Sequence, residues 1–200
     1  MNIFHASNKS LTKWIVIYAL MGLTLFLVSC AGPHMITKSN KPEFEAKSGK
    51  ALLVIVRTMS IFGSVPVENY LDGKLIGITR GKSYFITDVN PGKHYLMARA
   101  DNMVTTRVDF EPEKIYFLQQ SIIPGGIFTM TAFYVFTYEE AMKQMNESGS
   151  RFLVYDPGDS DTYLSEKDFK EAKEEFDQEV SEENERHKEI LEYRGYNKTR

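Results

Sequence analysis

The stretch VPVENYLDGKLIGIT, residues 65–79, decides the fold of this 200-residue chain. Two runs rich in β-forming residues, 65–71 and 74–79, flank the pair Asp72-Gly73. An Asp-Gly pair accepts the positive φ that both central residues of a type I′ turn require, and such a turn joins two antiparallel strands. The stretch therefore predicts a β-hairpin.

Further short runs of apolar and β-branched residues surround this hairpin, at 51–57, 83–89, 94–100, 104–110, 115–123 and 127–137. Turn residues separate them. In the run Asn90-Pro91-Gly92-Lys93, Pro91 fixes φ and Gly92 accepts a positive φ. Residues 111–114 supply another turn, which we expect to pair the strands on either side. Strands spaced roughly 8–12 residues apart, with no long helix between them, indicate an antiparallel β-sandwich of about seven to eight strands over residues 51–148.

Helical patterns come near the end of the chain. Residues 138–145 predict a short helix, and the run Ser165-Glu166-Lys167-Asp168 resembles a capping box that begins a helix ending at residue 193. The second helix has a thin apolar stripe, with 12 acidic and 5 basic residues between 166 and 192. We interpret it as an accessory interaction arm, either solvent-exposed or docked on a partner. The segments that flank it are an acidic linker, 149–164, and a basic tail, 194–200.

The N-terminus has the pattern of a signal peptide. Residues 1–13 contain Lys9 and Lys13 but no acidic residue, and residues 14–29 are mostly apolar. An apolar run of this length is nearer to the core of a signal peptide than to a membrane span of about 20 residues. We therefore predict a signal peptide over residues 1–29.

Cys30 is the only cysteine of the chain and directly follows this run. The sequence Leu27-Val28-Ser29-Cys30 resembles the lipobox of bacterial lipoprotein signals. That resemblance implies cleavage between Ser29 and Cys30, followed by attachment of diacylglyceryl and N-acyl chains such as palmitate to Cys30. Several chains together give a lasting membrane anchor. The alternatives are an uncleaved anchor helix or a free thiol.

The residues after the lipobox bear on location. Ala31 stands where an Asp would imply retention in the inner membrane, so the resemblance implies a lipoprotein of the cell envelope, in the outer membrane and facing the periplasm. Residues 30–50 are rich in Gly, Pro, Ser, Asn and Lys and predict a flexible tether. Fully extended, such a tether would lift the domain by roughly 60 Å.

The strand and turn sequences of the domain also resemble a known family. The matching runs are Tyr70 to Gly77, Ser83 to Phe85, Val89 to His94 and Lys114 to Leu118. Over roughly residues 51–145 they are similar to the bacterial domain of unknown function 2846 and, more loosely, to PEGA-type surface domains. The resemblance implies a small envelope lipoprotein with a β-sandwich and no assigned activity. Asn90 stands where that family would have Pro, and residues 111–113 replace a Gly-containing turn.

Residues that carry chemistry are sparse. His94 lies beside a turn and His187 in the acidic helix, and neither accompanies a nucleophile motif. Lipidation consumes the Cys30 thiol that thiolate chemistry or a zinc site would use. Residues 30–164 carry 14 basic and 15 acidic residues, which does not suit nucleic-acid binding. We therefore expect no catalytic residue, no metal and no cofactor apart from the lipid.

The sequence predicts a membrane-anchored, non-catalytic module that contacts an envelope protein or a glycan. Its aromatic strands, 115–123 and 127–136, are the candidate surface. The alternative is an envelope enzyme, or an accessory subunit of one, whose site has no recognisable motif. An exposed aromatic cluster would favour binding, whereas a deep pocket holding His94 and carboxylates would favour the enzyme.

Overall fold

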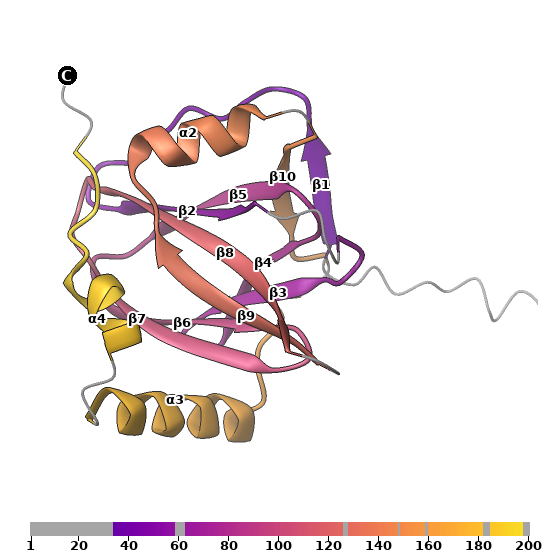
Figure 1. The fold of residues 1–200 in the computed structure, drawn as a ribbon. Coiled ribbons are helices and arrows are strands. Elements are labelled where there is room, and N and C mark those ends of the chain that lie inside the picture. The colour runs from indigo at the N-terminus through magenta and orange to yellow at the C-terminus, as the bar shows by residue number, and fades with distance from the viewer. Residues whose placement is uncertain are drawn as a thin grey trace, which may run out of the picture. The chain divides into compact units, whose positions relative to one another are not determined.

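A computed structural model describes residues 34–58, 63–125, 128–147, 149–158, 160–181 and 185–197. The predicted signal peptide and lipobox, Ser29 and Cys30 included, lie outside these residues. The described part of the chain is mainly β, with two facing sheets and few helices, as the sequence predicts (Figure 1).

The larger sheet has six strands in the order β1-β10-β5-β2-β8-β9. In that order they are His34–Lys38, Arg151–Asp156, Ser83–Val89, Ala51–Arg57, Ile115–Gly125 and Phe128–Val135. Two neighbouring pairs, β2 with β8 and β10 with β5, are parallel, and the others are antiparallel. Strand β2 is buried along its whole length, which agrees with its unbroken apolar run.

The smaller sheet has four strands in the order β4-β3-β6-β7, which are Lys74–Thr79, Val67–Leu71, Gly92–Arg99 and Met103–Phe110. Strands β3 and β4 form the antiparallel hairpin around Asp72 and Gly73. These two residues have φ values of 49° and 81°, so both have the positive φ that a type I′ turn requires.

Two short turns carry the chain from one sheet to the other. Pro91 lies between β5 and β6, and Gly92 begins β6 with a φ of 121°. The expectation that residues 111–114 pair their flanking strands is wrong, because β7 pairs with β6 whereas β8 pairs with β2 and β9. The reason is that β8 is apolar on both faces: Tyr116 faces the space between the sheets, and Phe117 packs on the outer side. A strand of that kind is stabilised inside a sheet covered on both sides.

Two segments predicted to be a tether and a linker contain strands. Residues 34–38, within the expected tether 30–50, form β1 and pair with β10 along their whole length. Strand β10 in turn lies within the expected acidic linker 149–164 and pairs with β5. The edge of β5 would otherwise present unpaired backbone groups, and β10 pairs with its first three residues, Ser83 to Phe85. The sandwich therefore extends beyond residues 51–148 and has ten strands among the described residues.

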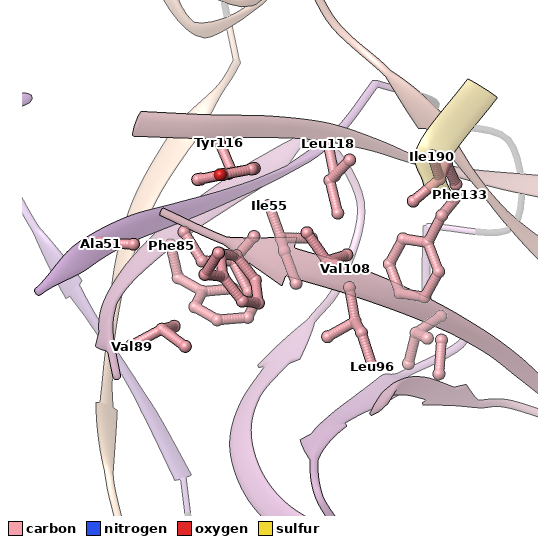
Figure 2. Close-up of a cluster of buried hydrophobic side chains, with 14 of the residues drawn as sticks. Ala51, Ile55, Phe85, Val89, Leu96, Val108, Tyr116, Leu118, Phe133 and Ile190 are labelled. Atoms are coloured by element: carbon pink, nitrogen blue, oxygen red, sulfur yellow. The ribbon is translucent and has the colours of Figure 1, made fainter. Parts of the chain in front are cut away.

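The main core fills the space between the sheets. Figure 2 shows side chains from both sheets meeting there, among them Ile55 and Phe85 from the larger sheet and Leu96 and Val108 from the smaller one. A second cluster lies on the outer face of the larger sheet, where helix α2 (Tyr138–Asn146) packs against strands β2 and β8.

The predicted C-terminal helix is two helices, α3 (Glu166–Ser181) and α4 (Glu185–Glu192), and both pack on the sandwich (Figure 1). Phe176 of α3 is 2% exposed, and Ile190 of α4 is 3% exposed and belongs to the main core. The interpretation of this segment as an accessory arm is therefore wrong. A thin apolar stripe is sufficient because α3 covers only the outer face of the smaller sheet, where Ala172 joins a third apolar cluster.

The segment after α4 is also attached to the sandwich. Tyr196, in the predicted basic tail, exchanges two backbone hydrogen bonds with Ile115, of 3.0 and 2.6 Å. Its ring stacks on that of Tyr138, with the two centroids 4.8 Å apart. Tyr196 thus lies against the N-terminal turn of α2 and the first residue of β8.

Candidate functional site

A cavity of about 180 Å³ lies beside strands β7 and β9, with α3 and α4 forming the rest of its wall. Strand β7 ends the smaller sheet and β9 ends the larger one. The cavity therefore lies where neither sheet continues. Residues 102–106 supply one side of it and residues 130–134 the other.

Three buried polar atoms of described residues around this cavity have no hydrogen-bond partner. They are Oδ1 of Asn102 and the hydroxyl oxygens of Thr106 and Thr131. Leaving such a group buried and unsatisfied costs about 1–3 kcal/mol. Since most buried polar atoms in proteins are paired, three unpaired ones around a single cavity indicate a place where a ligand can form hydrogen bonds.

His187 and Glu179 connect the two helices at the wall of the cavity. His187 is 7% exposed, and its Nε2 lies 2.7 Å from a carboxylate oxygen of Glu179. The imidazole packs edge-on against the ring of Phe176, with a centroid distance of 5.0 Å. These contacts attach α4 to α3. They also place the polar side chains of His187 and Glu179 next to the apolar ring of Phe176 in the wall of the cavity.

Exposed apolar side chains line the same cavity. Ile123, Met130 and Tyr134 are 38, 41 and 39% exposed, and Ile123 pairs with Met130 across strands β8 and β9. The two strands were predicted as the candidate surface. In the structure, alternate residues such as Leu118 and Phe133 lie in the core, and these three do not. Grouped apolar side chains on a surface are typical of interaction sites.

The border of the cavity on α3 is acidic. Glu175 and Glu179 line it, and residues 166–181 contain seven acidic and three basic residues, a net charge of −4. Such a border attracts cationic groups and disfavours anionic ones.

Asp177 fixes α3 on the smaller sheet next to this border. The Tyr95 hydroxyl donates a hydrogen bond of 3.0 Å to its carboxylate, and the Lys173 ammonium donates another of 3.0 Å. Burial alone would raise the pKa of the Asp177 carboxyl, but the bonds from Lys173 and Tyr95 together lower it. The carboxylate is therefore stabilised as an anion. Its hydrogen bond from Tyr95 attaches α3 to strand β6.

A second hollow, of about 550 Å³, lies beside the β3–β4 turn. Here Nδ1 of His94 is 2.5 Å from Oδ2 of Asp72, whose other oxygen accepts a hydrogen bond of 2.9 Å from the backbone N–H of Tyr95. Lys74 and Asp161 form an ion pair of 2.7 Å on another part of the wall. The described lining residues include no serine or cysteine, which are the usual nucleophiles beside a histidine–carboxylate pair.

The predicted turn residues do not meet at the first cavity. Asp72 and Gly73 form the hairpin turn, where Asp72 additionally holds His94, and Pro91 and Gly92 lie in a connection between the sheets. Sequence reasoning missed the polar residues around the cavity, which come from segments far apart in the chain. No local signal identifies them.

Comparisons with family models, with curated proteins and with solved structures found no match. The resemblance to the domain of unknown function 2846 therefore stays a prediction. Among the described residues, no helix is long and apolar enough to cross a membrane. In the same part of the chain, no group of three or more His, Cys, Asp or Glu side chains is placed to hold a metal ion.

Proposed function

We propose that this protein is a lipid-anchored, non-catalytic module of the cell envelope that binds a protein partner at the cavity between β7 and β9. The motif ending at Cys30 supports the anchor. One observation carries the binding function: exposed apolar side chains and unpaired buried polar atoms converge on a single cavity.

The size of the cavity favours a side chain of a protein partner over a complete small-molecule ligand. Its volume of about 180 Å³ is below the roughly 300–1,000 Å³ of typical small-molecule pockets. It therefore suits one apolar side chain of a partner, with Ile123, Met130 and Tyr134 contacting the surface around that side chain. Burying a side chain the size of Leu contributes about 1.5–3 kcal/mol, as expected of an interface anchor.

The charge of the border specifies the partner further. Glu175 and Glu179 would face residues that flank the inserted side chain, so Lys or Arg is favoured at those positions. Thr106 and Thr131 can accept or donate hydrogen bonds if a polar group of the partner reaches them. The proposed partner segment is thus apolar at its centre and basic at its flanks.

Peptide binding tests this site. The probe is a fluorescent peptide of about 12 residues with a central Leu flanked by Lys, titrated onto the mature full-length protein in detergent. We expect Glu175→Lys to weaken binding by about tenfold, because it reverses charge at the border. The matched control is Glu171→Lys on the same helix, where the side chain is 64% exposed and does not line the cavity. Equal affinities of the two variants, or binding only of a soluble glycan fragment, would contradict the proposed site.

The anchor is tested separately. Cys30→Ala should leave an unprocessed precursor, because the modified thiol is what the lipoprotein peptidase recognises. Mass spectrometry of the N-terminal peptide decides the question. An unmodified thiol at Cys30 in mature protein would refute the anchor.

The second candidate function, an envelope enzyme or an accessory subunit of one, is favoured by the His94–Asp72 pair in the second hollow. A histidine oriented by a carboxylate can act as a general base. Turnover of a panel of chromogenic esters by the mature protein, lost on His94→Gln, would support this candidate. Turnover equal to the buffer rate would leave Asp72 and His94 a structural role in the β3–β4 turn.

A further inference from the structure

Strand β1 begins very close to the proposed lipid attachment point. His34 is its first residue and lies four positions after Cys30. An extended chain spans at most about 3.6 Å per residue, so the Cα atoms of these two residues are no more than about 14 Å apart. We call residues 31–33, between Cys30 and β1, the stem. Because all five residues of β1 pair with β10, the stem cannot lengthen unless β1 separates from the edge of the sheet.

A groove of about 290 Å³ lies alongside β1. His34, Met35 and Thr37 of β1 line it together with Arg80 and Arg151. Both arginines are exposed, and Nη2 of Arg151 donates a hydrogen bond of 2.7 Å to the backbone carbonyl of Arg80. This contact keeps the two basic residues next to each other.

The charges around the groove are predominantly positive. Asp156 lies 3.6 Å from Nε2 of His34 and is the described carboxylate at that end of β1. Arg80 and Arg151, at the other end, carry two permanent positive charges. Attraction between such charges and an anionic surface acts within about one Debye length, which is about 10 Å at 0.1 M salt. The stem holds the start of β1 within about 14 Å of Cys30, so a strand β1 that lies along the bilayer surface brings both arginines within this range.

We propose that the domain lies directly on the membrane, with the groove beside β1 facing the phosphates of anionic phospholipids. This inference rests on lipidation of Cys30, which belongs to the proposed function. The guanidinium groups of Arg80 and Arg151 match phosphate oxygens in geometry and charge. Ile36 of β1 is 37% exposed and, because successive side chains of a strand alternate, lies on the opposite face from Met35 and Thr37, which line the groove.

Fluorescence quenching in vesicles tests the orientation. The mature lipidated protein is reconstituted into vesicles of phosphatidylethanolamine and phosphatidylglycerol that contain a lipid with a spin-labelled headgroup. Cys30 is the only native cysteine and is blocked by lipid, so a thiol introduced by Ile36→Cys can be labelled alone with an environment-sensitive dye. Ile36 does not line the groove, which leaves the groove intact. The control label is Lys167→Cys on α3, where the native side chain is 78% exposed.

We expect the dye at position 36 to be quenched about threefold more strongly than the dye at position 167. A Gly/Ser spacer of about 20 residues between Gly32 and Pro33, with a root-mean-square length of about 25 Å, should remove that difference. The double variant Arg80→Glu, Arg151→Glu should reduce the difference in quenching between the two positions in these vesicles. The control variant Lys167→Glu should leave that difference unchanged.

Mass spectrometry of the N-terminal peptide accompanies each variant. An unlipidated Cys30 would refute the proposed function itself. Equal quenching at positions 36 and 167 in lipidated protein would overturn the orientation while leaving the anchor intact. Quenching that is insensitive to the double arginine variant, or identical in vesicles of phosphatidylcholine alone, would overturn the contact between the groove and anionic lipid.

Discussion

The β3–β4 hairpin and the C-terminal segment from α3 to Tyr196 differ in what determines their structure. The hairpin depends on residues next to each other in the chain, because Asp72 and Gly73 both adopt the positive φ of the turn. The C-terminal segment depends on residues far away in the chain. Phe176 packs against the ring of Tyr95, and Tyr196 bonds to Ile115. Composition alone makes the second region look like a detachable acidic arm, whereas its packing makes it part of the domain.

Removing the C-terminal segment should have the largest effect on stability. Truncation after Leu164 deletes several side chains that pack on the sandwich, among them those of Phe176, Ile190, Tyr193 and Tyr196. At about 1.5–3 kcal/mol for each fully buried side chain, the free energy of unfolding should fall by at least roughly 5 kcal/mol. Urea denaturation measures it, with truncation after Asn197 as the control. A loss of unfolding free energy below about 1 kcal/mol would show that the C-terminal segment is an accessory arm and not part of the domain.

A single side chain should account for much of that loss. Phe176→Ala should lower the free energy of unfolding by about 3–5 kcal/mol, because it leaves a cavity under α3. Phe169→Ala on the same helix is the matched control, since Phe169 is only partly buried and should cost less. If the two variants lose equal stability, Phe176 has no special role in attaching α3.

The strands and the hairpin turn of this fold could be predicted from sequence, because alternation and Asp-Gly are local signals. The pairing of β8 with β2 could not, since it depends on which strand is apolar on both faces and on where the chain crosses between sheets. For the same reason the sequence predicts a tether and a linker where the structure has β1 and β10. Each is a short strand stabilised mainly by its partner.

The candidate site was only partly predictable. The aromatic strands were identified as a surface, but the phase that points Tyr134 out of the core and Phe133 into it depends on the register with β8. Thr106, Thr131 and His187 come from three elements that meet only in the folded chain. Single threonines in strands are common, and nothing in their neighbours marks them as unpaired.

A substitution at Gly73 should show where the two regions meet. Gly73 has a φ of 81°, and a Cβ built on it would lie 3.2 Å from Cδ2 of Phe169. Gly73→Val should therefore lower the free energy of unfolding by about 1–3 kcal/mol through backbone strain, with a further loss from the displaced ring. Gly149→Val is the matched control, because Gly149 has a φ of 85° and nothing within 4 Å of such a Cβ. Equal losses would mean that the Phe169 contact contributes nothing.

Acid should weaken the attachment of α3, and this is the smallest of the predicted effects on stability. The pKa of Asp177 is lowered in the folded state, so its contribution to stability is present above the ordinary carboxyl value of 3.8 and is lost as the pH falls through the folded-state value. The carboxylate is partly exposed, so this contribution is below about 1 kcal/mol. Urea midpoints between about pH 3 and 6 should show Asp177→Asn less acid-sensitive than the wild type, and Glu171→Gln unchanged. Identical pH dependence of all three proteins would contradict the role of Asp177.

Hydrogen exchange on the unaltered mature protein tests most directly whether the C-terminal segment belongs to the domain. Mass spectrometry follows peptides from α3 and α4 alongside a peptide from β2. If Phe176 and Ile190 hold the helices on the sandwich, both helices should exchange about a hundredfold more slowly than the same peptides free in solution. Exchange of α3 and α4 at the rate of the free peptides, while β2 remains protected, would show that the segment is an arm after all.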